Sequence, residues 1–189
     1  CIDTGFIVYN IESYPNLIAL FAHLNVQTQE TEMSFSVSKD MGALEYSGQS
    51  LRAMFAQKSN LLRPRHWKMI REILRFYREA PKIAQRADAD RLTLGEYLTE
   101  NKYSLEFIHD HLIPMGAAIW STPATDMLAY PALTFIRFCE NHGLLQLKDR
   151  PQWRTVKNGS QTYVQKIATA LGSSVKLNAA VRCIRYIDD

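Results

Sequence analysis

The chain has 189 residues, enough for one good hydrophobic core or for a compact domain with a helical extension. Apolar residues make up 47% of it and charged residues 22%, a composition that excludes a disordered chain. The net charge of +3 is mild and does not by itself indicate a nucleic-acid partner, which usually needs Lys and Arg gathered on one face.

The first predicted strand covers Ile2 to Tyr9 and is interrupted at Thr4-Gly5, where a glycine indicates a bulge or a close approach of another molecule to the backbone. Ser13 is placed to cap a helix from Tyr14 to Leu24, with Pro15 in its first turn. A strand and a helix are therefore expected before residue 25.

A hairpin is predicted next. Met33 to Val37 alternates with period two, Leu44 to Tyr46 is a second short strand, and Asp40 to Gly42 is a plausible turn between them.

From Ser50 the apolar period changes to that of helices. A capping box at Thr93 and Glu96 marks one helix start, and the charged stretch Gln85–Arg91 is the best candidate linker. In the helix that begins at Pro64, the residues expected on the buried face are Trp67, Ile70, Ile73, Leu74 and Tyr77. The expected helical segments are Ser50–Gln57, Pro64 to near Pro81, Leu94–Glu100, Ser104–Leu112, Ile113–Ser121 (a tight helix or turn) and Thr125–Asn141.

The last part of the chain returns to strands. Leu144–Leu147 and Trp153–Val156 are strand-like, and a helix follows with one apolar face and Gly172 just past its end. Two more β-runs are expected at Val175–Leu177 and Val181–Ile187. The apolar face of the helix consists of Tyr163, Val164, Ile167, Ala168 and Leu171.

This order predicts an α+β fold, in which both chain ends form a mixed sheet and a large helical insertion lies between them. We expect a single partial domain, with residues 1–48 and 144–189 as the sheet part and residues 49–143 as the helical part. The chain begins with Cys1 inside strand-like residues and ends on Asp188-Asp189 directly after another strand, so we expect it to be part of a longer protein.

The chain has three cysteines, Cys1, Cys139 and Cys183. Because their number is odd and they are widely spaced, they argue against a disulfide framework and fit a reducing compartment. No apolar run has the length of a membrane span and no signal-peptide pattern is present, so the cytoplasm is the expected location. Cys139 lies on an apolar helical face and is expected to be inert core.

Several segments resemble the FAD-dependent amine oxidase superfamily and, more narrowly, its bacterial predicted NAD/FAD-binding oxidoreductases. The resemblance covers nearly the whole chain. It implies a flavin-dependent oxidoreductase that moves a hydride from a small-molecule substrate to FAD, with the protein supplying position and electrostatics and residues 49–143 forming a helical substrate cap. The segments that carry it are DTGFIVYNIESYPNLIALFAHL, MSFSVS, RPRHWKMIREILRF, PMGAAIWS, NHGLLQLKDRPQWRTV and WRTVKNGSQTYVQKIATALGSSVKLNAAVRCI.

A pyrophosphate cradle is missing from these 189 residues. Dinucleotide folds need closely spaced glycines between a strand and a helix, and none of the eight glycines here forms a GxG pair. The resemblance places that motif before the DTGF segment, in the remainder of the protein's own chain. We therefore expect FAD to be bound by the intact protein and the fragment alone to be inactive.

The resemblance also implies cofactor contacts within this chain. The segment Thr4, Gly5, Phe6 and Ile7 would pass beside the flavin ring, and Val181 would meet the adenine end through its backbone. The alternative is that Gly5 is a plain bulge and Val181 is core.

The expected substrate-binding residues are Tyr9, Trp153 and Arg154. A Trp beside an Arg can stack on a planar ligand, or the Arg can clamp a carboxylate. The alternative is a sheet aromatic with an exposed neighbour. No residue is assignable as a catalytic acid, base or nucleophile.

His109 and His111, with Asp110 between them, suggest a metal site at first sight. Residues two apart on a helix point to different faces, so we expect a solvated helix face and no metal. His66, His23 and His142 have no recognisable partner in the sequence.

A basic cluster offers an alternative function. Arg71, Arg75 and Arg78 lie at helical spacing and could make this a non-catalytic binding module for an anionic partner or a membrane surface. The competing interpretation is a solvated helix face balanced by Glu72 and Glu79.

Overall fold

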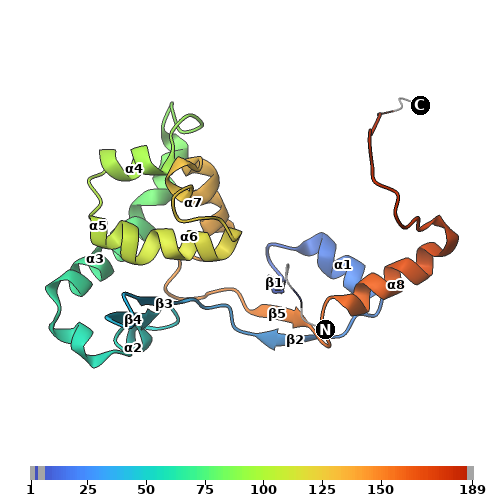
Figure 1. Ribbon diagram of the computed structural model, residues 1–189, viewed down its shortest axis with the longest axis horizontal. Coiled ribbons are helices and arrows are strands. Elements are labelled where there is room, and N and C mark those ends of the chain that lie inside the picture. The colour runs from blue at the N-terminus through green and yellow to red at the C-terminus, as the bar shows by residue number, and fades with distance from the viewer. Residues whose placement is uncertain (1–2, 4–6, 187–189) are drawn as a thin grey trace. The chain divides into compact units, whose positions relative to one another are not determined.

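The computed structural model describes residue 3 and residues 7–186 (Figure 1). This part of the chain forms two compact units, one within residues 1–31 and 152–189 and the other within residues 32–151. None of the described helices is both long and apolar enough to cross a membrane.

The first unit contains a three-stranded antiparallel sheet, in the order β1 (Tyr9–Asn10), β5 (Trp153–Val156), β2 (Thr28–Thr31). The prediction that both ends of the chain share a sheet is confirmed, because β5 pairs with β1 and β2 at once. All described pairs in this sheet are antiparallel, so it is not mixed. Half of the predicted strand Ile2–Tyr9 (residues 2 and 4–6) lies outside the described residues, only Tyr9 of the remainder is in a strand, and β2 was not predicted.

Helices α1 (Pro15–His23) and α8 (Gln161–Leu171) complete this unit. Phe21 is the centre of its small core, with its ring 5.4 Å from that of Tyr9 and 5.2 Å from that of Tyr163. Lys166 fastens α8 to the end of α1 by donating hydrogen bonds to two backbone carbonyls. Both helices were predicted, but the N-cap of α1 is Tyr14 and not Ser13.

The segment after α8 contradicts the prediction of two further strands. After the short 3₁₀ turn η5 (Gly172–Ser174), residues 175–186 have no regular structure and are largely exposed. Ile187 lies outside the described residues. A strand needs a neighbour to receive its backbone hydrogen bonds. No described strand lies beside Val175–Leu177 or the described part of Val181–Ile187.

The second unit begins with the predicted hairpin, β3 (Ser36–Lys39) and β4 (Leu44–Ser47). Its turn is the predicted one: Asp40, Met41 and Gly42 all have positive φ, and the Gly42 amide donates to the carbonyl of Lys39. The first strand starts three residues later than predicted. Helix α2 (Leu51–Met54) follows and is capped by the hydroxyl of Ser50.

The rest of this unit is helical and encloses the main core, in which Phe76, Phe107 and Phe135 are fully buried. With the sheets, these helices confirm the α+β class. Figure 1 shows the helices grouped around α6 and α7, with the hairpin beside α2. The elements are η1 (Lys58–Leu62), α3 (Pro64–Glu79), η2 (Ala80–Gln85), α4 (Leu94–Glu100), α5 (Leu105–Phe107), the π-helical turn η3 (Ile108–Leu112), α6 (Ile113–Trp120), η4 (Met127–Ala129) and α7 (Ala132–Asn141).

Helix α3 buries a different face from the predicted one. Trp67 and Leu74 are 49% and 42% exposed. The buried residues recur at spacings of three, four and three, which is also a regular helical stripe, but shifted by one position. A polar residue stands in this stripe, which consists of His66, Met69, Ile73 and Phe76.

Three other segments differ from prediction. Pro131 divides the expected helix Thr125–Asn141, so α7 starts only at Ala132. Leu144–Leu147 is a turn and not a strand. The predicted linker Gln85–Arg91 lies inside the second unit, where Ala89 is buried and Arg86 forms ion pairs with an adjacent and a distant carboxylate.

Candidate functional site

The three predicted substrate-binding residues lie together in the sheet of the first unit. Tyr9 stands opposite Arg154 across the β1–β5 pair, and both point to the same face because paired residues share a side of the sheet. Trp153 is buried and, by the alternation of strands, points to the other face. Arg154 already donates to the Thr28 hydroxyl at 3.2 Å and lies 3.7 Å from the carboxylate of Glu30. The sheet therefore gathers the three side chains without placing them around one cavity.

The predicted cofactor residues are only partly described. Thr4, Gly5 and Phe6 lie outside the described residues. Ile7 and Val181 lie in segments without regular structure and are 55% and 77% exposed. Val181 is therefore neither core nor the first residue of a strand in this structure.

The start of helix α8 is occupied by a carboxylate. Both oxygens of Asp3 accept hydrogen bonds from the backbone amide of Ser160, at 2.9 and 3.2 Å. A helix N-terminus attracts anions through its unpaired amides. Here an acidic side chain already takes that position and would repel a phosphate.

A second group of polar residues lies in the second unit, around Asp110 of the π-helical turn η3. Its carboxylate is 3% exposed, accepts from Lys39 of β3 at 2.6 Å, and pairs with Arg65 of α3 at 2.9 Å. Burying a carboxylate is costly unless it is paired and hydrogen-bonded, and these two cations satisfy both of its oxygens. Asp110 thus ties the hairpin and α3 to η3.

His111, the next residue, is also buried and contacts the hairpin. The Tyr46 hydroxyl donates to the carbonyl of Asp110 at 2.5 Å and lies 3.1 Å from Nδ1 of His111. Because the hydroxyl proton is used on the carbonyl, Nδ1 carries the imidazole proton and donates to the Tyr46 oxygen. Nε2 is then the unprotonated nitrogen, and it is buried without a partner. Burial lowers the pKa of His111 to about 3.

These two residues correct the expectation of a solvated helix face at 109–111. Only His109 is exposed; Asp110 and His111 are each 2% exposed. Their partners are some 45 to 71 residues away in the sequence, so no local pattern could have indicated the burial.

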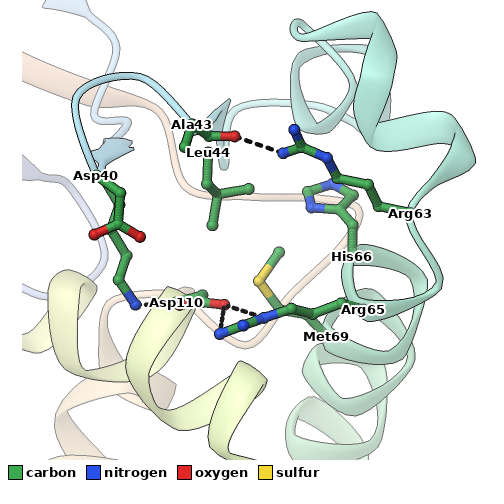
Figure 2. A pocket seen from close by; sticks show the side chains of 9 residues that line it. Asp40, Ala43, Leu44, Arg63, Arg65, His66, Met69 and Asp110 are labelled. Atoms are coloured by element: carbon green, nitrogen blue, oxygen red, sulfur yellow. Dashed lines mark hydrogen bonds and ion pairs between the residues drawn. The ribbon is translucent and has the colours of Figure 1, made fainter.

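A cavity of about 260 Å³ adjoins Asp110, between the hairpin and helix α3 (Figure 2). Its apolar wall includes Leu44 and Met69, and its neutral polar side chain is His66. The charged groups around it are three cations and two carboxylates: Lys39, Arg63, Arg65, Asp40 and Asp110.

His66 has a partner after all. One ring nitrogen, Nε2, lies 2.9 Å from the carbonyl of Met54, so Nε2 carries the proton that a carbonyl requires. The other nitrogen, Nδ1, is buried without a partner. Burial lowers the pKa of His66, which keeps the ring neutral and Nδ1 a hydrogen-bond acceptor.

The basic face of α3 is largely engaged within the protein. Arg75 pairs with Glu79 at 2.8 Å and covers the ring of Tyr103 at 4.4 Å. Arg78 also pairs with Glu79, whereas Glu72 accepts hydrogen bonds from the amide and hydroxyl of Ser104, the N-cap residue of α5. In the described part of the chain, Arg71 alone of the predicted three makes no ion pair.

Two further predictions concern metal and thiol chemistry. Among residues 3 and 7–186, no three His, Cys, Asp or Glu side chains are grouped to hold a metal ion. Cys139 is fully buried in the main core, as predicted, and burial raises the pKa of its thiol to about 12.

Comparison with known families gives the class of protein to which this α+β chain corresponds. The family model of flavin containing amine oxidoreductases matches residues 1–189. The chain belongs to that family. No curated protein matches the chain.

Membership of this family implies a flavin cofactor, and the described residues do not form a complete site for one. Ile7 and Val181 are exposed in irregular segments, and the Asp3 carboxylate occupies the N-terminus of α8. No GxG pair occurs anywhere in the 189 residues. Nothing here matches the backbone cradle that a pyrophosphate requires.

Proposed function

We propose that residues 1–189 are the substrate-side part of a flavin-dependent oxidoreductase that transfers a hydride from a small-molecule substrate to FAD. The observation that carries the proposal is the family match over the whole chain. The narrower assignment to the bacterial NAD/FAD-binding oxidoreductases is supported by the PMGAAIWS and WRTV segments.

The dinucleotide-binding part is, in this proposal, the remainder of the same polypeptide. Support comes from apolar side chains that the first unit leaves exposed. Burial of such side chains normally stabilises a fold, so in this proposal the remainder of the polypeptide covers them. Helix α8 has no buried residue despite its apolar face. The exposed apolar residues from α8 onward are Val164, Leu171, Val175, Leu177, Val181, Ile184 and Tyr186.

The substrate residues in this proposal are Tyr9, Trp153 and Arg154, and the flavin contacts are Thr4, Gly5, Phe6, Ile7 and Val181. The antiparallel pairing of Tyr9 with Arg154 supports the grouping of the first set. A cytoplasmic location is supported by the free thiols of Cys139 and Cys183, which fit a reducing compartment.

The test is anaerobic flavin reduction in the parent polypeptide. Mixing it with a panel of primary, secondary and cyclic amines without oxygen should bleach the oxidised-flavin absorbance for at least one compound. An Arg154→Gln variant should raise the concentration needed for half-maximal reduction, and Arg78→Gln should not. If no amine or related C–N compound reduces the flavin, the proposed reaction is wrong.

A further inference from the structure

The cavity beside Asp110 combines three features that the proposed function does not use. It has uncompensated positive charge, a buried acceptor without a partner, and a volume suited to a small metabolite. It lies wholly within residues 32–151, in the second unit, and none of the predicted flavin or substrate residues lines it.

The charge comes from Arg63. Lys39 and Arg65 share the carboxylate of Asp110, and Asp40 lies at the other side of the cavity (Figure 2). Arg63 makes no ion pair with a described carboxylate. Its guanidinium donates instead to neutral oxygens, the carbonyl of Ala43 at 2.5 Å among them. Three cations against two carboxylates leave one positive charge, which fits a singly charged anion.

The geometry presents these cations to a ligand. Figure 2 shows Arg63 and His66 at one side of the cavity and Arg65 reaching toward Asp110. The side chain of Arg65 is 62% exposed and that of Lys39 is 37% exposed, so both keep donors free for a ligand from solvent. Arg63 is held in place by its hydrogen bonds and needs little ordering on binding.

His66 indicates that the ligand also carries a hydrogen-bond donor. The residue is 3% exposed, its ring points into the cavity in Figure 2, and the lone pair of Nδ1 has no partner within the protein. A buried acceptor without a partner is costly, and a ligand that supplies a donor relieves that cost. A neutral donor such as a hydroxyl fits here, because an ammonium would face three cations.

Size limits the ligand further. A cavity of about 260 Å³ has room for about nine waters at ~30 Å³ each. It lies below the ~300–1,000 Å³ usual for drug-sized ligands, which excludes a nucleotide.

We propose that this cavity binds a small hydroxy-monocarboxylate. The carboxylate lies against Arg63 and Arg65, and the hydroxyl donates to Nδ1 of His66. Guanidinium groups suit this role because their planar donors match the two oxygens of a carboxylate. Leu44 and Met69 contact the carbon skeleton.

The experiment titrates the 189-residue chain, without flavin, with three nearly isosteric probes and follows NMR signals of arginine Nε–H groups and of the His66 ring. L-Lactate should give saturable shifts at Arg63, Arg65 and His66. Propionate, which lacks the hydroxyl, should bind about 2- to 10-fold more weakly for the loss of one hydrogen bond. Lactamide, which lacks the charge, should bind at least about tenfold more weakly.

Variants locate the site. Arg63→Gln and Arg65→Gln should each weaken lactate binding by about tenfold, whereas Arg78→Gln, on the same helix but away from the cavity, should not. His66→Gln keeps a donor for Met54 and should make lactate and propionate equal. Unfolding temperatures of all variants check that the fold is kept.

Several results would overturn the inference: no saturable shift with lactate, the same weakening in the Arg78 control as in the cavity variants, or equal affinity for lactate and propionate in the unsubstituted chain. Inorganic phosphate binding more tightly than lactate would overturn the assignment to a monocarboxylate. Because the assay contains no flavin, its failure leaves the proposed oxidoreductase function standing.

Discussion

Acid should destabilise the second unit through His111. Its imidazole is buried against Tyr46, Phe35 and Phe107. Its Nε2 has no partner, so an N–H formed there by protonation would have no hydrogen-bond acceptor. Protonation would create a buried cation, and the neighbouring Asp110 carboxylate is already shared by Lys39 and Arg65. The folded protein therefore keeps His111 neutral.

The size of the effect follows from linkage. The pKa of a histidine in an unfolded chain is 6.5, and that of His111 in the folded protein is about 3, so between these values the unfolded chain binds the proton and the folded chain does not. Stability is full above pH 6.5 and falls as the pH drops below it. Going from pH 7 to pH 5 should remove about 2 kcal/mol of the free energy of unfolding. The lowered pKa of His66 acts in the same direction.

The assay is urea unfolding at pH 7 and pH 5, followed by far-ultraviolet circular dichroism, which reports mainly on the helices of residues 32–151. A His111→Phe variant keeps a ring against Tyr46 but cannot titrate. Whatever its stability at pH 7, it should lose about 2 kcal/mol less on acidification than the unsubstituted chain. His109→Gln, at an exposed position, should leave the pH dependence unchanged. If His111→Phe shows the same loss between pH 7 and 5 as the unsubstituted chain, the explanation is wrong.

Two substitutions test the backbone and the caps. Gly143→Ala should cost about 2–3 kcal/mol, because φ is +65° and the new Cβ would collide with the rigid ring of Pro151; Gly42→Ala, at φ +88° with only the flexible side chain of Glu45 at 3.6 Å, should show only the ~1–2 kcal/mol cost of a positive φ. Equal losses for the two in urea unfolding would remove the collision from the account. Thr93→Ala should cost about 1 kcal/mol by breaking the capping box, whereas Thr99→Ala, near the C-terminal end of the same helix, should be near neutral; a Thr99 effect as large as that of Thr93 would argue against the cap.

The sequence predicted best those features that depend on neighbours in the chain. The capping box at Thr93 and Glu96 is present as expected, and so is the turn at Asp40–Gly42. Both are set by residues within three positions of each other, so their chemistry is visible in the sequence. The same holds for α3, whose limits were predicted although its buried face was not.

Features that depend on distant partners were missed. Leu144–Leu147 and Val175–Leu177 have the alternation of strands, but no described strand lies beside them to accept their hydrogen bonds. Conversely, β2 is polar and was not predicted, yet it forms a full ladder with β5, more than 120 residues away. Strand formation is decided by pairing, which periodicity does not show.

In the candidate sites too, residue types were visible in the sequence, whereas contacts between distant residues were not. The aromatic and basic types at Trp153 and Arg154 suggested a ligand site, but the sequence did not show that Arg154 stands opposite Tyr9. The cavity at Asp110 was missed because polar residues at 109–111 indicate a surface, and their burial depends on the distant residues Lys39, Tyr46 and Arg65. The burial of His66 was missed as well, because the predicted buried face of α3 did not include it.

The most direct test of the proposed function is an absorbance scan of two proteins, each purified with FAD present: the 189-residue chain and its parent polypeptide. We predict flavin bands in the parent and none in the 189-residue chain, because these residues contain no GxG pair to form a pyrophosphate cradle. Bands in neither protein would contradict the assignment to a flavin-dependent oxidoreductase. Bands in the 189-residue chain itself would contradict the division of the cofactor site proposed here.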